Sequence, residues 1–532
     1  DVVFVSNRRA SSVYAVVPSG EANPQVIEVA RDLNMPNGIA FRDGDLYVAE
    51  IDRILVYRNI MQRFTQLPAP EVLNVRLPAE RHHGWRYIGF GPDDKLYYSI
   101  GEQGHNFGRN LRKPNLALVL PTADEVDQDN WRTYSGKILR LNLDGSIPED
   151  NPEIEGVKSH IYSYGHRNPQ GLAFGEDGTL YEAEHGPATD DELNIIQPGG
   201  NYGWPRVAGR IDGENYLYIN WSEAPADVNE NADPLPDSVP QFPETTFDAE
   251  MVEPLATYFT VGDDYPIGEV CGYICDPTIA PSSILPYKAG DGGIAEWDNS
   301  ILLSTLKHGT LYVQHLSDDG KTAEGDPVAW LSTQNRYRDV MIGPDNRVFI
   351  ATDAFGSAAQ KFGDGLNTSI LHNPGAILVY TYGEGGGSGL GMARESTTVE
   401  EALASGPSGS TPQEFEDPAT GKDTPAEAEA ASVTADSNVA DVAALGGPKF
   451  AQTCATCHGP AGRSDAAAVL AGNGKLESAE YVATTIVHGF GYMPAFGNQL
   501  TDNDIAEIGT YIRNSWGNDY GVLTTEEVTQ AR

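Results

Sequence analysis

One short pattern of apolar and polar positions recurs along the first three quarters of the chain. An apolar strand is followed by a Gly/Asp turn and then by a second apolar strand. Four copies are close to one another and two are looser: 39–50, 88–101, 172–184 and 340–353, then 136–146 and 294–306. Asp-Gly and Asp-Asn pairs form tight hairpin turns because they accept positive φ. The flanking β-branched and aromatic residues favour strands.

Many hairpins with a recurring spacing favour a β-propeller over a β-sandwich. Six copies predict six blades, so the expected fold class is mainly β, a six-bladed β-propeller with a C-terminal all-α domain. The copies are irregularly spaced, so long loops must carry the extra residues. In a propeller such loops gather at one end of the central channel, where a small-molecule site forms.

The amino-acid composition of the chain changes after residue 383. Residues 384–438 are rich in Gly, Ser, Pro, Ala and Glu and poor in aromatic residues. Such a composition cannot bury enough surface to fold alone. We therefore expect a propeller domain at 1–383, a flexible linker at 384–438 and a compact helical domain at 439–532. In the last domain, Thr501 followed by acidic residues marks the start of a helix.

Charge narrows the classes of function. The chain holds 35 basic and 76 acidic residues, a net charge of −41 at pH 7. This argues against a nucleic-acid partner, because phosphate binding needs a basic surface. The acidic excess keeps the protein soluble, especially in a salty habitat, or attracts a basic electron acceptor. No apolar run is long enough to span a membrane, and the chain opens on a strand, so we expect an exported protein in its mature form.

The helical domain carries the attachment pattern of haem c, Cys454-Ala-Thr-Cys457-His458. The two thiols lie one helical turn apart, as addition to the two haem vinyl groups requires, and the adjacent histidine reaches the iron. Met493, in a proline-containing loop before the last long helix, suits the sixth position, with His488 as a competitor. This tail resembles class I cytochromes c. The resemblance implies haem c bound by Cys454 and Cys457, with His458 and Met493 as axial ligands, and such ligation raises the haem potential.

The other two cysteines, Cys271 and Cys275, lie in the sequence CGYIC. They form either a disulfide or a reduced pair in a turn. The haem motif favours an oxidising compartment, so we expect a periplasmic or secreted protein.

Residues 163–209 carry the most specific functional signal. This segment closely resembles the soluble PQQ-dependent glucose dehydrogenases and their aldose dehydrogenase relatives, β-propeller quinoproteins. Further matches follow in the same order at 83–106, 271–288, 304–313 and 335–345. The resemblance implies a quinohaemoprotein sugar dehydrogenase that transfers hydride from a sugar hydroxyl or hemiacetal to pyrroloquinoline quinone (PQQ). Its electrons would pass to the fused haem and then to an external cytochrome, copper protein or oxidase.

PQQ is a flat orthoquinone with three carboxylates, so it needs cationic partners. Arg336 and Arg338 lie on the same side of a strand, and Lys307 lies at a strand end before a Gly turn. Arg167 and Asn168 lie in a loop between blades. The resemblance implies that these five residues hold the quinone.

Hydride removal from an alcohol also needs a base for the hydroxyl proton, a role that suits histidine. His83 falls at the family's position for this base, and His82 beside it is the fallback. The resemblance implies that Arg167 also steadies negative charge on the quinone.

Calcium is the expected metal, because a hard cation polarises the quinone carbonyl and accepts backbone carbonyls as ligands. The family's cofactor calcium maps to Gly186 and Pro187. The acids that follow, Asp190, Asp191 and Glu192, either support this site or lie on the surface.

A second, structural calcium is expected around Ala208, Arg210 and Asp212, with Glu244 as a further candidate ligand.

Departures from the family put glucose itself in doubt. Asp276 stands where the glucose enzyme has tryptophan, and Phe107 and Gly108 replace a polar substrate contact. Tyr273 is retained and is a candidate to stack on a sugar ring. Another pyranose, an oligosaccharide or a sugar aldehyde therefore remains a candidate substrate.

The alternative function is a propeller that only binds carbohydrate or protein, fused to a cytochrome shuttle. The combined set of candidate base and cations favours the enzyme, because a mere binder needs no such set.

Overall fold

The structure is a computed structural model. It describes the following residues: 2–19, 22–73, 76–102, 104, 110–229, 234–262, 265, 278–359, 367–368, 371–382, 397–398, 432–435, 437–454, 458, 462–463, 470–488, 496 and 500–532. The chain divides into two compact units, Asp1–Ser408 and Gly409–Arg532.

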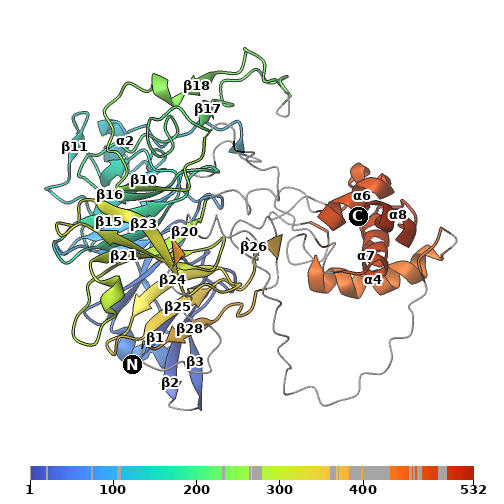
Figure 1. Ribbon diagram of the computed structural model, residues 1–532, viewed down its shortest axis with the longest axis horizontal. Coiled ribbons are helices and arrows are strands. Elements are labelled where there is room, and N and C mark those ends of the chain that lie inside the picture. Colours follow the sequence, from blue (N-terminus) through green and yellow to red (C-terminus); the bar gives the residue numbers. More distant parts are fainter. Residues whose placement is uncertain are drawn as a thin grey trace. The chain divides into compact units, whose positions relative to one another are not determined.

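Among the described residues, six antiparallel sheets of three to five strands form the body of the first unit (Figure 1). In chain order they are β1 (Val3–Asn7), β2 (Ser12–Ser19) and β3 (Ala22–Ala30); β4 (Ile39–Arg42), β5 (Asp45–Ala49), β6 (Ile54–Tyr57) and β7 (Glu71–Val72); β8 (Ile88–Phe90), β9 (Leu96–Ile100), β10 (Lys137–Leu141) and β13 (Ile161–Tyr164); β14 (Pro169–Phe174), β15 (Leu180–Glu184), β16 (Asp191–Ile195) and β19 (Ala256–Tyr258); β20 (Pro281–Tyr287), β21 (Ser300–Thr305), β22 (Leu311–Leu316), β23 (Ala323–Trp330) and β29 (Thr397–Thr398); and β24 (Tyr337–Ile342), β25 (Val348–Thr352) and β28 (Ile377–Tyr380). The first strands of successive sheets contact one another, as in a propeller. The predicted six-bladed β-propeller is confirmed.

Apolar side chains pack between the blades and form the core. Val13 and Ala15 of the first blade pack with Leu46 and Val48 of the second, and comparable clusters fill the spaces between later blades. A blade sandwiched between two others is covered on both faces, so its middle strands are continuous apolar runs. The sixth blade closes onto the first where the Arg9 guanidinium lies 4.6 Å from the centre of the Phe355 ring.

The repeat pattern predicted the number of blades correctly, but its six copies do not correspond one to one to the six blades. The four close copies are the first two strands of blades two, three, four and six. The copy at 136–146 is β10, which pairs with β9 inside blade three. The copy at 294–306 contributes β21 alone. Blade one begins the chain without a Gly/Asp hairpin, so the pattern missed it.

Shorter elements decorate the blades. They are the strand pairs β11 (Glu153–Ile154) with β12 (Val157–Lys158), β17 (Leu217–Ile219) with β18 (Gln241–Pro243), and β26 (Ala358–Ala359) with β27 (Asn367–Thr368), and the helices α1 (Ile60–Arg63), η1 (Phe64–Gln66), α2 (Ala123–Asp127), η3 (Glu244–Thr246) and η5 (Ala295–Trp297).

The second unit is helical, as predicted (orange to red in Figure 1). It contains α4 (Val439–Thr453), η6 (Gly474–Glu477), α6 (Ala479–His488), α7 (Asp502–Arg513) and α8 (Thr525–Gln530). Thr501 caps α7 as expected, since its side chain accepts a hydrogen bond from the Asp504 amide in a capping box. Cys454 follows directly after α4.

The helices α4 and α7 approach each other closely at Gly446. A Cβ atom there would lie 2.0 Å from the Glu507 carbonyl oxygen, so the two backbones touch where only glycine fits. The neighbouring Gly447 would place its Cβ 3.2 Å from a Tyr511 ring carbon, a contact that a small shift accommodates.

We expect Gly446→Ala to destabilise the helical unit by about 1–3 kcal/mol, because the helices must separate. Guanidinium unfolding followed by the helical circular dichroism signal measures this change. Gly474→Ala in the same unit is the matched control, because a Cβ there would meet no atom within 4 Å, and it should leave the unit as stable as wild type. Equal midpoints for Gly446→Ala and wild type would contradict this account of the crossing.

No helix among the described residues is long and apolar enough to cross a membrane. The predicted linker lies outside the described residues except for β29 and a few residues from 432 onward.

Candidate active site at one end of the propeller channel

The functional side chains come from equivalent ends of several blades. In a hairpin, the start of the first strand and the end of the second lie at the same edge. His83 precedes β8, Arg167 precedes β14, and Arg336 precedes β24, while Glu102 follows β9 and Asp353 follows β25. The fold therefore brings these five residues to one end of the channel.

Contacts across the channel confirm this convergence. The Arg338 guanidinium of blade six lies 3.9 Å from the centre of the Trp85 ring, which precedes blade three. Its Nη1 donates to Gln170 Oε1 of blade four at 3.3 Å. Blade six is not a neighbour of blades three and four in the ring, so these contacts span the channel mouth.

His83 is paired with a buried carboxylate. Its Nδ1 lies 2.5 Å from Glu102 Oε1, and Glu102 also accepts hydrogen bonds from the Gly104 amide and from Asn115 Nδ2. Burial, and then the positive charge of Arg167, lower the pKa of His83 well below its usual value. The imidazole is therefore neutral at pH 7, and with Nδ1 held by Glu102 its Nε2 is the atom left for a substrate proton.

The backbone of His83 is strained. Its φ of 47° lies in the left-handed region, which costs about 1–2 kcal/mol for a residue with a side chain. The carbonyl of His83 lies 2.3 Å from where Gly101 would carry a Cβ, so the loop closes tightly on the end of β9. Such strain is typical of functional loops held by their surroundings.

Arg336 and Arg338 share one carboxylate, Asp353. Arg338 binds it with two hydrogen bonds of 2.8 and 2.7 Å, and Arg336 Nε lies 3.2 Å from it. Burial alone would raise the pKa of Asp353, but the two guanidinium groups lower it below the usual value. Asp353 thus remains charged and fixes both arginines.

Further positive charge lies at the same end of the channel. Arg8 stacks on Trp85 at 4.3 Å, and Arg338 also lies over this ring. Burial, followed by Arg86 and Arg338, lowers the pKa of Arg8 to about 9. In a chain with a net charge of −41, this concentration of positive charge suits a ligand with several negative charges.

Lys307 is buried and contacts Thr278 Oγ1 through its Nζ. Burial raises the pKa of Asp191 to about 6, although the charge of Lys307 opposes the rise. Asp191 also accepts hydrogen bonds from the amides of Gly186, Ile279 and Ala280 at 2.9, 2.7 and 2.7 Å. It therefore ties the loop that carries Gly186 and Pro187 to blade five.

The acids after this loop belong to the interior and not to the surface. Asp190, Asp191 and Glu192 are all buried, so the surface alternative is wrong. A Cβ on Gly186 would lie 1.8 Å from the Thr189 carbonyl oxygen, so the tight turn before these acids requires glycine.

Arg167 is held in place but keeps an unused donor. Its Nη1 donates to the His185 carbonyl at 2.9 Å, and its amide donates to Glu184. Its buried Nε has no hydrogen-bond partner among the described residues. Asn168, also buried, lies beside it with its side chain 3.2 Å from His185 Nδ1. A buried donor without a partner indicates a place for a polar ligand.

Two of the residues expected around a second calcium, Asp212 and Glu244, lie together. Glu244 is buried, and its Oε1 accepts hydrogen bonds from the Asp212 and Gly213 amides, whereas its Oε2 has no partner among the described residues. Ala208 is buried nearby in the chain. The Arg210 side chain is bound to Glu253 at 2.6 Å, so only its carbonyl is suited to bind a cation.

In the helical unit, Cys454 and His458 are buried, and the His458 amide donates to the Cys454 carbonyl at 3.0 Å. They therefore lie one helical turn apart beside the apolar core, as haem attachment requires. Cys457 and Met493 lie outside the described residues. So do Tyr273, Asp276, Phe107, Gly108 and the pair Cys271 and Cys275.

Sequence reasoning missed Glu102, Asp353, Arg8 and Trp85. The two acids carried a detectable signal, because each stands at or just after the end of a repeat copy. Arg8 and Trp85 stand outside the copies, and only the closed ring of blades brings them to the mouth.

Comparisons with known proteins identify a family for each of the two units. The family described as glucose/sorbosone dehydrogenase matches residues 52–237 and 259–360. The family described as cytochrome c oxidase, cbb3-type, subunit III matches residues 441–512.

Three relatives illustrate the two parts. Quinoprotein glucose dehydrogenase B of Acinetobacter calcoaceticus is 39% identical over 414 residues, which cover 71% of this chain and 86% of that protein. Aldose sugar dehydrogenase YliI of Escherichia coli is 27% identical over 307 residues, covering 57% and 63%. Cytochrome c6 of a Picosynechococcus species is 37% identical over 91 residues, covering 14% and 76%. The chain belongs to the glucose/sorbosone dehydrogenase family of oxidoreductases and carries a C-terminal cytochrome c domain.

Proposed function

We propose that the chain is a PQQ-dependent, aldose-type sugar dehydrogenase of the periplasm or the extracellular space. It would oxidise a sugar hydroxyl or hemiacetal and deliver the electrons to its own haem c, and then to an external cytochrome, copper protein or oxidase. The observation that carries the proposal is the neutral imidazole of His83, held by Glu102, beside a cluster of buried and half-buried cations.

The residues at the channel mouth fit PQQ. Lys307, Arg336, Arg338 and Arg167 match its carboxylates in charge, and the buried Nε of Arg167 offers an unused donor. When bound, PQQ supplies the orthoquinone that accepts hydride. The carbonyl oxygens of Gly186 and Pro187 would hold the cofactor's calcium, because calcium accepts backbone oxygens.

The chain's own residues handle the proton. His83 Nε2 takes the proton of the substrate hydroxyl, and Glu102 stabilises the imidazolium that forms. Arg167, fixed by Glu184 and the His185 carbonyl, keeps a positive charge where negative charge develops. Tyr273 and Asp276 are proposed to contact the sugar.

In the second unit, Cys454 and Cys457 would attach the haem, and His458 and Met493 would ligate its iron. Tethering replaces a bimolecular encounter between the sugar-oxidising site, once reduced, and its electron acceptor by a high effective concentration.

Dye reduction by the full-length protein tests the proposal. The protein is loaded with PQQ and Ca²⁺, and a panel of aldoses is added with an artificial electron acceptor. Turnover that requires both PQQ and an aldose supports the proposal. Failure to bind PQQ would overturn it and leave the alternative of a binding propeller with a cytochrome shuttle.

The pH dependence follows from His83. Its lowered pKa keeps the imidazole neutral, and therefore basic, as the pH falls through the ordinary histidine value of 6.5. We expect kcat/KM with the artificial acceptor to stay within about twofold between neutral pH and pH 6.5 and to fall only below it. A half-maximal rate at or above pH 6.5 would contradict the assignment.

We also propose a structural calcium ion at Asp212 and Glu244, supported by the unpartnered Glu244 Oε2. Calcium should raise the melting temperature of the PQQ-free protein by a few degrees, and Glu244→Gln should remove this shift. Glu223→Gln, at an exposed position, is the control. An equal calcium shift in Glu244→Gln would refute the site.

A further inference from the structure

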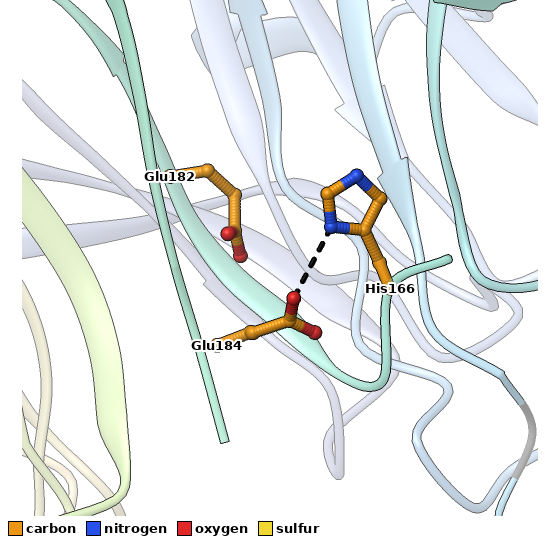
Figure 2. Close-up of side chains that lie close together, drawn as sticks. All are labelled: His166, Glu182 and Glu184. Carbon is orange, nitrogen blue, oxygen red and sulfur yellow. Dashed lines mark hydrogen bonds and ion pairs between the residues drawn. The ribbon is translucent and has the colours of Figure 1, made fainter. Parts of the chain in front are cut away.

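Behind the channel mouth, in blade four, one histidine and two glutamates meet in the interior. Glu182 and Glu184 lie on the same face of β15, and His166 comes from the loop before β14 (Figure 2). Each residue offers one ligand atom, and these atoms lie within 4.8 Å of one another. All three side chains are buried.

The charge of this cluster is not balanced by the contacts around it. In the register of β15 with β16, Glu184 faces Glu192 directly, and Glu182 faces Asn194. Like charges opposite one another destabilise a sheet, and a third buried carboxylate adds to the cost. Among the described residues His166 is the one ion-pair partner within the cluster, and the charge of Arg167 acts on Glu184 from the channel side. The charges of His166 and Arg167 are too few to neutralise three buried carboxylates.

In each glutamate, one carboxylate oxygen is already bound by a partner outside the cluster. Glu184 Oε2 accepts the Arg167 and Asn168 amides, which leaves Oε1 facing His166 Nδ1 at 3.2 Å. Glu182 Oε2 accepts Asn194 Nδ2 at 3.0 Å, and its buried Oε1 has no partner among the described residues.

The imidazole is oriented in the same way. His166 Nε2 is bound to Ser163 Oγ at 2.9 Å, and its ring stacks on Tyr202 with 4.5 Å between the ring centres. One atom held by an outer partner and the other pointing inward is the arrangement that orients metal ligands. Asn194, which pairs with Glu182 across the two strands, offers a fourth candidate ligand atom, because its buried Oδ1 also has no partner in the described part of the chain.

We propose that His166, Glu182 and Glu184 bind one divalent metal ion, Zn²⁺ or Mn²⁺, with Asn194 as a further ligand. An imidazole with carboxylate and amide oxygens is a donor set for these metals, whereas calcium prefers oxygen ligands alone. The ion neutralises the buried glutamates and fixes Glu184, which holds the amides of Arg167 and Asn168. It thereby braces the loop that enters the channel mouth. The site does not depend on the function proposed above.

Metal analysis of the full-length, haem-containing protein tests this site. The protein is incubated with Zn²⁺ or Mn²⁺, freed of unbound metal by gel filtration and analysed by mass spectrometry. Iron is assigned to the haem and calcium to other sites. We expect about one Zn²⁺ or Mn²⁺ per chain and a metal-dependent rise in melting temperature.

Glu182→Gln should bind the metal at least ~10-fold more weakly and lose that rise. Ser163→Ala, which keeps all three ligands but releases His166, should weaken binding less and serves if Glu182→Gln fails to fold. Glu176→Gln, an exposed change in the turn of the same hairpin, is the matched control and should bind as wild type. The proposal fails if the folded wild type retains neither metal, or if Glu182→Gln and Ser163→Ala both bind as wild type. If the wild type bound no metal and Glu182→Gln melted at a higher temperature than the wild type, a proton and not a metal ion would balance the buried charge.

Discussion

Replacement of His83 by asparagine is expected to lower kcat by roughly 10²–10⁴-fold, the usual contribution of a positioned general base. PQQ affinity should stay close to wild type, because His83 is not among the cations proposed to hold the cofactor. Asparagine is the appropriate replacement, since it tolerates the left-handed φ of 47° at this position. Steady-state kinetics with an artificial acceptor and a PQQ titration separate the two effects.

Two further variants locate the base. Glu102→Gln keeps an acceptor for His83 Nδ1 but removes its charge, and the loss of a charge-assisted hydrogen bond of about 1.5–3 kcal/mol should lower kcat by about 10- to 100-fold. His82→Asn should retain most of the activity. If His82→Asn abolished turnover and His83→Asn did not, the neighbouring histidine would be the base and the assignment would be wrong.

Replacement of Lys307 by methionine is expected to weaken PQQ binding by about 30-fold to several thousand-fold. The loss of one partner from a buried charge pair costs about 2–5 kcal/mol, and 1.4 kcal/mol corresponds to about tenfold. Lys307 is 5% exposed and lies near buried Asp191. Without the lysine, Asp191 loses the charge that opposes its protonation, and the loop of Gly186 and Pro187 should loosen as well.

A titration of the PQQ-free protein with PQQ at saturating Ca²⁺ measures this loss. Lys288→Met, which removes an exposed lysine just after β20, has the same side-chain change and should bind PQQ like wild type. A dissociation constant for Lys307→Met within about threefold of wild type would mean that Lys307 only balances Asp191 and does not contact the cofactor.

The fold could be predicted from the sequence because its main signal is local. A hairpin needs only a turn and two apolar strands, so the close copies at 39–50, 88–101, 172–184 and 340–353 could each be recognised alone. The partner of a strand is not local. The segment at 136–146 was counted as a separate blade, although it pairs with β9 across an intervening loop of more than 30 residues.

The residues of the candidate site also divide into those that the sequence revealed and those that it did not. His83 and the cations could be found because they lie in long ordered motifs. Each of the four close copies ends on an acidic residue or is directly followed by one: Glu50, Glu102, Glu184 and Asp353. Each of these acids binds an arginine, a histidine or a backbone amide at the channel mouth. This repetition was present in the sequence, but its meaning depends on the closed ring.

The buried metal-ligand cluster was beyond sequence reasoning for a related physical reason. Glu182 and Glu184 follow the strand period of two, which shows that they share a face. Nothing in their spacing shows that this face is buried or that Glu192 stands opposite Glu184. Those facts come from the strand register and from the packing of blade four against its neighbours.

Haem reduction by sugar tests the central claim most directly. The PQQ- and Ca²⁺-loaded full-length protein, with its haem oxidised, is mixed with an excess of an aldose that supports dye reduction, and the reduced-haem band is followed in a stopped-flow instrument. The account predicts haem reduction that requires PQQ and sugar, is lost in His83→Asn, and has a first-order rate independent of protein concentration. Dye reduction by the same protein with an oxidised haem, or a rate proportional to protein concentration, would contradict electron transfer within one chain.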